Sequence, residues 1–99
     1  MITESHTILM RVDVDPRLAA AVGGAARALA EAAEVDEETA SQWQGKVLMA
    51  SREALAHPLE DAQRVEVKIL RLADRIEVTF LHSLGVTRLI QEIGQRAVR

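Results

Sequence analysis

The stretch RVEVKILRLADRIEVTF, residues 64–80, decides the fold of this chain. Apolar and polar side chains alternate in both of its halves, and a short turn, residues 73–75, separates them. The apolar positions are Val65, Val67, Ile69, Ile76, Val78 and Phe80. Because alternation with period two places side chains on one face of a strand, the stretch predicts strands over 64–72 and 76–81. These strands should form an antiparallel hairpin with one apolar and one wet face.

The N-terminal part of the chain predicts a further strand followed by a helix. Residues 8–14 alternate in the same way and are expected to form a half-buried strand. Asp15 then precedes a proline, which indicates a helix over 16–34 capped by the aspartate. Within this helix the pair Gly23 and Gly24 indicates either a close approach to another element or a kink.

A second helix is predicted over 37–57, with Asp36 as its N-cap and Pro58 as its stop. Trp43 lies on the apolar stripe of this helix, so we expect a core or interface residue there. The C-terminal stretch 86–99 is predicted as a third helix. Its apolar residues at helical spacing are Val86, Leu89, Ile90, Ile93 and Ala97.

The resulting order β-α-α-β-β-α predicts an α+β fold. Strands and helices that each have one apolar face are most simply arranged as a two-layer α/β sandwich, with an antiparallel or mixed sheet covered by helices on one face. The 99 residues are enough for a single domain over 1–99.

Composition excludes several classes of function. The chain has no cysteine, which rules out disulfides, thiolate zinc sites and cysteine nucleophiles. The net charge of −3, with no cluster of Lys or Arg, argues against nucleic acid as a partner. No apolar stretch is long enough to span a bilayer, and no signal peptide is evident. We therefore expect a cytoplasmic protein with no membrane association.

Three segments together resemble the GHKL (histidine-kinase-like) ATPase superfamily, most closely its small bacterial anti-sigma serine kinases. Residues 12–55 resemble the first strand and two helices of that family, residues 64–80 resemble its hairpin, and GVTRLIQEIG, residues 85–94, resembles its terminal helix. The resemblance implies a histidine-kinase ATPase-like fold. It also implies a homodimer that pairs through the first strand and the Ala-rich first helix.

The nucleotide-binding motifs of that family are degenerate here. In the family motif E-A-x-x-N, the Glu polarises a nucleophile or water and the Asn gives an oxygen to magnesium. Glu53 matches the Glu, but His57 replaces the Asn, and imidazole is a poor magnesium ligand. The adenine-reading Asp of D-x-G-x-G aligns with His82 or Ser83. Only residues 81–85 separate the expected last strand and helix, so the ATP lid is missing.

We therefore expect a non-catalytic regulatory or protein-interaction module, a pseudo-kinase whose partner is a sigma factor or an anti-sigma antagonist by resemblance. Glu53 is the vestigial catalytic candidate, and His57 and His82 are the vestigial cofactor-binding candidates. One alternative is a residual serine/threonine protein kinase that binds ATP and magnesium. A second is a small homodimeric domain in which Glu53, His57 and His82 hold a zinc or nickel ion. The leading interpretation involves no cofactor and no metal.

Overall fold

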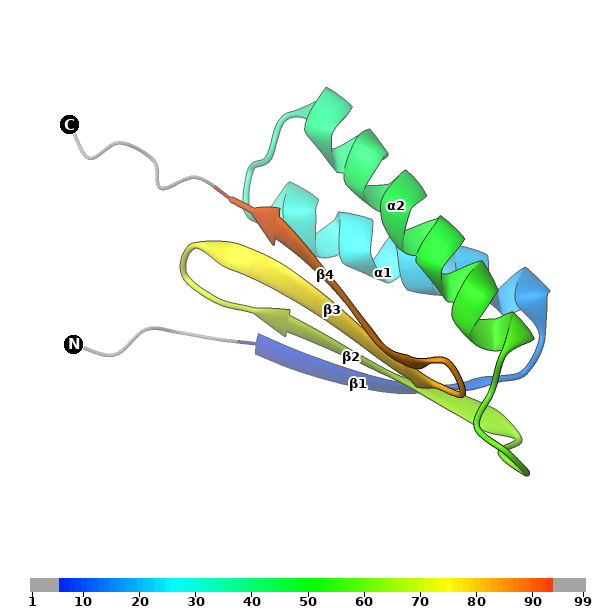
Figure 1. Ribbon diagram of the computed structural model, residues 1–99. Helices are drawn as coiled ribbons and strands as arrows, with labels where there is room; N and C mark the ends of the chain where they lie inside the picture. Colours follow the sequence, from blue (N-terminus) through cyan, green and yellow to red (C-terminus); the bar gives the residue numbers. More distant parts are fainter. Residues whose placement is uncertain (1–5, 94–99) are drawn as a thin grey trace, which may run out of the picture.

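The structure, a computed structural model, describes residues 6–93 as a four-stranded sheet covered on one face by a pair of helices (Figure 1). In chain order its elements are β1 (His6–Asp13), the 3-10 helix η1 (Pro16–Leu18), α1 (Ala19–Ala32), α2 (Glu37–Ala56), β2 (Arg64–Arg71), β3 (Arg75–His82) and β4 (Gly85–Glu92). The expected α+β class is confirmed, and so are both predicted helices and the hairpin at 64–80.

The sheet is antiparallel throughout, in the order β1-β2-β3-β4. Ile8 lies opposite Ile69, which in turn lies opposite Val78, and Val78 lies opposite Leu89. This row of apolar side chains crosses all four strands on the face beneath the helices. The alternation read from the sequence therefore fixes which face of the sheet is covered.

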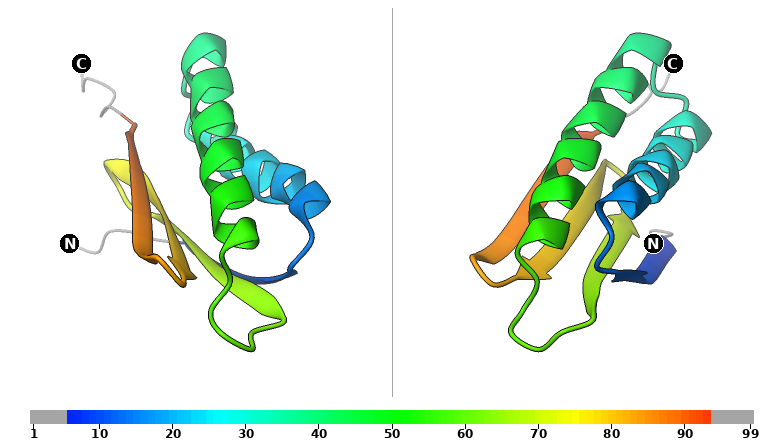
Figure 2. Two further views of the ribbon diagram at one scale, coloured as in Figure 1. Left: turned by 45° about the vertical axis from the view of Figure 1, so that its right-hand side comes forward. Right: turned by 90° about the vertical axis from the view of Figure 1, so that its right-hand side faces the viewer.

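The core lies between that inner sheet face and the two helices, which run side by side over it (Figure 2). Its largest fully buried side chains are Trp43, Phe80, Ile69, Ile76, Val22, Val47, Val67 and Val78. Trp43 is a core residue, and its indole N–H donates to the backbone oxygen of Ala26, 3.1 Å away. This buried hydrogen bond joins α2 to α1 and satisfies the one polar atom of the indole.

Local sequence signals explain where the helices begin. Asp15 accepts a hydrogen bond from the backbone N–H of Arg17, and Asp36 accepts one from that of Thr39. The first turn after Asp15 is a 3-10 helix, so α1 begins three residues later than expected.

The glycine pair does not break α1. A Cβ built on Gly23 would lie 3.3 Å from the backbone oxygen of Gln44, so close approach of the helices is the correct alternative.

The expected C-terminal helix over 86–99 is wrong. Residues 85–92 form β4, an edge strand that pairs with β3 along its whole length, and residues 94–99 lie outside the described range. The hairpin turn between β3 and β4 is only Ser83 and Leu84, followed by Gly85 at φ +126°, a conformation that glycine adopts readily. The observed order is therefore β-α-α-β-β-β, and the sheet gains a fourth strand.

Candidate functional site

The candidate residues Glu53 and His57 lie at the C-terminal end of α2, and no hydrogen bond joins their side chains. Glu53 and His57 are both exposed. The imidazole Nδ1 of His57 lies 3.1 Å from the backbone oxygen of Glu53. Since a carbonyl oxygen only accepts, Nδ1 carries the hydrogen, and the ring caps its own helix. The Glu53 carboxylate lies on the helix surface. The His57 ring does not partner it, either as a base or as a second metal ligand.

His82 lies near this helix end, as the metal alternative requires, but its ring nitrogens are already used. The backbone N–H of Ser83 donates to the backbone oxygen of His57 at 2.8 Å, which ties the β3–β4 turn to α2. His82 itself is buried. Its Nδ1 accepts from the N–H of Leu84 at 3.2 Å, so its Nε2–H donates to the hydroxyl oxygen of Thr87 at 2.7 Å. His82 therefore holds the hairpin together.

The structure brings the predicted residues near one another without forming a ligand site from them. Within residues 6–93 no group of three or more His, Asp or Glu side chains is placed to hold a metal ion. The expected five-residue connection after the hairpin is in fact a two-residue turn into β4. The residues that the resemblance aligned with D-x-G-x-G, from His82 or Ser83 onward, form the end of β3, this turn and the start of β4.

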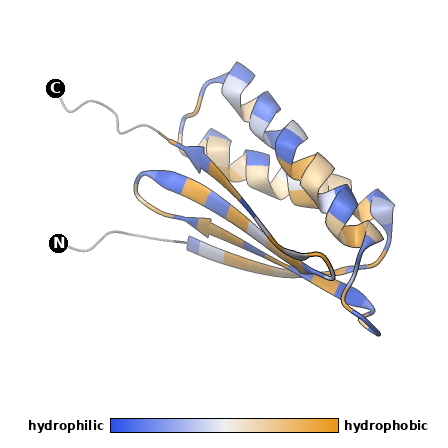
Figure 3. Ribbon diagram, viewed as in Figure 1, coloured by the Kyte–Doolittle hydropathy of each residue, from blue (hydrophilic) through white to orange (hydrophobic). Residues whose placement is uncertain are grey.

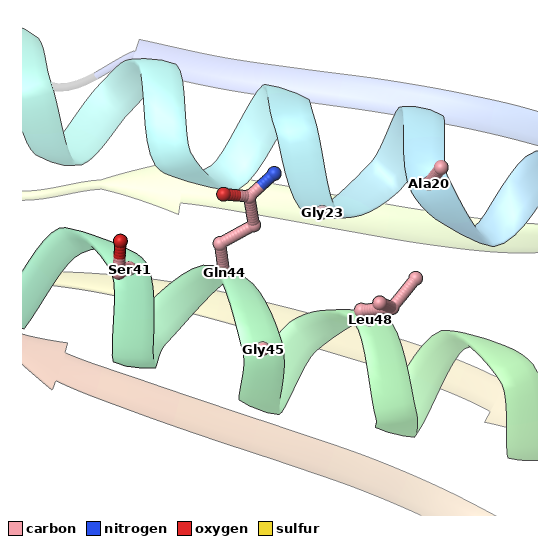
Figure 4. A pocket seen from close by; sticks show the side chains of 6 residues that line it. All are labelled: Ala20, Gly23, Ser41, Gln44, Gly45 and Leu48. Atoms are coloured by element: carbon pink, nitrogen blue, oxygen red, sulfur yellow. The ribbon is translucent and has the colours of Figure 1, made fainter.

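A shallow groove of about 260 Å³ lies between α1 and α2, on the side away from the sheet (Figure 4). Its lining residues are Ala20, Gly23, Ser41, Gln44, Gly45 and Leu48. The side chains of Gln44 and Leu48 point from α2 toward α1. The groove follows from small residues at the helix contact, since each absent side chain leaves space at the surface.

Arg27 on α1 binds the polar side chains beside this groove. Its guanidinium donates to the Gln44 side-chain oxygen at 2.9 Å, to the Ser41 hydroxyl at 3.2 Å and to Glu31 at 3.0 Å, and it also pairs with Glu37. Hydrogen bonding, first to Glu31 and then to Glu37, raises the pKa of Arg27. Because the polar atoms at the groove are already paired within the helix layer, the arrangement is that of a helix–helix seam.

The face of the sheet opposite the helices, here called the open sheet face, consists of the outward residues of all four strands. Colouring by hydropathy shows the strands alternating along their length (Figure 3). On this face Leu81 and Val86 lie directly opposite each other on β3 and β4, 42% and 63% exposed, and Ile90 on β4 is 50% exposed. Leu81 and Val86 form an exposed apolar pair, from which Arg88 separates Ile90, and adjacent exposed apolar side chains favour a contact surface.

Glu77 is the unusual residue of the open sheet face, because it is only 7% exposed there. Its carboxylate accepts from Arg75 at 2.7 Å and from Arg88 at 2.9 Å. These bonds, first that of Arg75, lower the pKa of Glu77, although its burial acts in the opposite direction. The two arginines therefore fix a carboxylate beside Ile90, its cross-strand neighbour.

The sequence reasoning missed Glu77, Arg88, Val86 and Ile90 as surface-forming residues. Their signal was present in the β-branched residues of 86–90 and in the two-residue spacing of Val86, Arg88, Ile90 and Glu92. The stronger helical spacing of Val86, Leu89, Ile90 and Ile93 concealed it.

No protein-family model, curated protein or solved structure matches this chain. Within residues 6–93 no helix is long and apolar enough to cross a membrane.

Proposed function

We propose that this chain is a non-catalytic protein-interaction module that binds its partner through the open sheet face. The observation that carries the proposal is the cross-strand pair Leu81 and Val86, two exposed apolar side chains on the face that no helix covers. Burying such side chains against a partner is favourable by about 25 cal/mol per Å² of apolar surface.

The positions of the candidate catalytic and cofactor-binding residues support the same proposal. Glu53 lies on the exposed surface of α2, His57 binds helix backbone, and His82 is committed to the β3–β4 hairpin. General acid–base work requires a side chain positioned against a substrate atom, and each of these groups has a structural position instead.

The resemblance to anti-sigma serine kinases extends the proposal to a partner class. It implies a sigma factor or an anti-sigma antagonist as the partner, and therefore a cytoplasmic regulatory role. Residues 85–92, which the resemblance matched to the terminal helix, form β4 instead, so the partner class depends on residues 12–55 and the hairpin at 64–80.

A photo-crosslinking residue placed at position 81 tests the contact surface in cells. Met49, 71% exposed on α2, is the matched control position, because it is also a large apolar side chain at the surface. We expect position 81 to capture one defined protein that position 49 does not capture. The purified partner should then bind the native chain, and Leu81→Lys should weaken that binding at least about tenfold, or about 1.4 kcal/mol.

Calorimetric titration with ATP and magnesium separates this proposal from the kinase alternative. We expect no heat of binding at millimolar nucleotide. A micromolar dissociation constant, abolished by Glu53→Gln, would establish the residual kinase and overturn the proposal. Equal capture at positions 81 and 49 would overturn the assignment of the open sheet face.

A further inference from the structure

The outer edge of β4 presents backbone N–H and C=O groups that β3 does not bind, and among them the C=O of Glu92 also accepts from the Gln91 side-chain N–H at 2.9 Å, which leaves its second lone pair. The N–H of Ile93 donates to the backbone oxygen of Asp74, 3.0 Å away, on the β3 side. Since N–H groups alternate sides along an antiparallel strand, the odd-numbered residues of β4 also bond to β3. The N–H and C=O groups of Val86, Arg88, Ile90 and Glu92 therefore face the open edge.

Within the described residues, this edge lacks several of the common protections against strand pairing. β4 is eight residues long, and it contains no proline, no lysine and no break in its register with β3. Prolines, lysines and bulges usually prevent exposed strand edges from pairing, because free backbone groups can form hydrogen bonds with another strand. The only charged residues of β4 are Arg88 and Glu92, which carry opposite signs.

We propose that β4 pairs antiparallel with β4 of a second copy about a two-fold axis at Ile90, so that the two four-stranded sheets become one. In this register Ile90 lies opposite Ile90 of the other copy, and Arg88 lies opposite Glu92 on both sides of the axis. All of these pairs are of the hydrogen-bonded kind, because they use the N–H and C=O groups that face the edge. Opposite charges and apolar residues that meet across strands are both favourable.

The charges on β4 favour this register over those with an axis at Leu89 or Arg88. Within residues 6–93 the carboxylate of Glu92 has no ion pair, and Arg88 uses only one terminal nitrogen, for Glu77. Arg88 can therefore bind both carboxylates through its remaining N–H groups. A two-fold axis at Leu89 would set Val86 against Glu92, and an axis at Arg88 would set two arginines against each other.

The edge formed by β1 is less suited to the same pairing. Its outward charges are already used, because Arg11 pairs with Glu66 and Asp13 pairs with Arg64 on β2. A two-fold axis that sets Arg11 of one copy opposite Asp13 of the other would lie at Val12, close to the end of β1. Only residues 11–13 would then overlap. The fourth strand, which the sequence did not predict, therefore provides the better edge.

The helix layer leaves room for this arrangement. A two-fold axis perpendicular to the sheet keeps the helices of both copies on the same face. α2 packs mainly on β3 and less on β4. The two α2 helices would then lie about three strand spacings apart, ~14 Å, which exceeds the ~8–10 Å of directly packed helices. Leu89, half-buried beneath α2, would face the space between the two α2 helices.

Cysteine substitution tests the register of the β4–β4 pairing directly, because the full chain has no cysteine of its own. Ile90→Cys places two thiols next to the proposed axis, with Cα atoms about 5.5 Å apart. Val86→Cys is the matched control on the same face and strand, but its two copies would lie about 27 Å apart along the strands. We expect a short bis-maleimide to join Ile90→Cys into a covalent dimer and to leave Val86→Cys as a monomer.

Sedimentation and light scattering of the full chain test the same interface without a crosslinker. We expect a concentration-dependent species of twice the 10.9 kDa chain mass. Ile90→Lys sets two like charges at the axis and should raise the dimer dissociation constant at least about tenfold. Circular dichroism confirms folding of the variant, and Met49→Lys on α2 is the control that should leave the dissociation constant unchanged.

A monomer at every concentration, crosslinking at position 86 instead of 90, or a folded Ile90→Lys variant that still dimerises would each overturn the proposal. These outcomes are independent of the proposed partner binding. The proposed partner binding is measured at Leu81 with a different protein. Pairing through β4 is measured from the mass of the purified chain alone.

Discussion

The Nε2 atom of His82 lies 2.7 Å from the hydroxyl oxygen of Thr87, and this hydrogen bond joins β3 to β4 on the inner face of their hairpin. His82 is buried, and its other ring nitrogen accepts from the N–H of Leu84 in the turn. A histidine that was expected to be a relic of nucleotide binding is therefore a structural element of the last hairpin.

Thr87→Val tests the strength of this link. The valine keeps the shape of threonine but leaves the buried Nε2–H without an acceptor, so the free energy of unfolding should fall by about 1–3 kcal/mol. Thr79→Val on β3 is the control, because the Thr79 hydroxyl has no hydrogen bond with residues 6–93. Urea denaturation measures both variants, and equal effects would show that the link contributes nothing.

The neighbouring glycines of α1 form a matched pair for the helix contact. Gly24→Ala should raise the free energy of unfolding by about 0.5–1 kcal/mol, because alanine loses less backbone entropy and nothing lies within 4 Å of its new Cβ. Gly23→Ala should gain less than this or lose stability, because its Cβ would meet the Gln44 backbone oxygen at 3.3 Å. Thermal melting compares the two. Equal gains would contradict a close helix contact at Gly23.

Glu77 should give the protein an acid-sensitive component of stability. Hydrogen bonds from Arg75 and then from Arg88 lower its pKa in the folded chain below the ordinary value of 4.5. The folded state therefore binds fewer protons than the unfolded state near that pH. This contribution is complete above pH 4.5 and is lost as the pH falls through the lower folded pKa. Stability measured against pH should have a flatter acid limb in Glu77→Gln, and an unchanged slope would refute the assignment.

Trp43→Phe tests the buried bond between the two helices. The ring remains apolar, but the backbone oxygen of Ala26 keeps only its helical donor and the smaller ring leaves a void in the core, so the free energy of unfolding should fall by about 1–3 kcal/mol. Because Trp43 is the single tryptophan, circular dichroism must follow the unfolding of the variant. Met49→Ala, at an exposed position of the same helix, should change stability by less than about 0.5 kcal/mol. A comparable loss in both variants would assign the effect to α2 as a whole.

The candidate site could be predicted only in part. The sequence placed Glu53 and His57 one turn apart at the end of α2, and the metal alternative required His82 to lie near that helix end, as its neighbour Ser83 does. The direction of each side chain could not be predicted, because the hydrogen bonds of His57 and His82 depend on a helix end and a two-residue turn that meet only in the folded chain.

The sequence by itself determined that two helices follow the first strand, predicted over 16–34 and 37–57 and observed over 19–32 and 37–56. It also determined the hairpin at 64–80 and the inner face of the sheet, because period and capping residues are local signals. Only the tertiary structure decided the state of residues 85–92. Their apolar residues fit a helix as well as a strand. The open backbone groups on the outer side of β3 favour the strand, because pairing satisfies those groups.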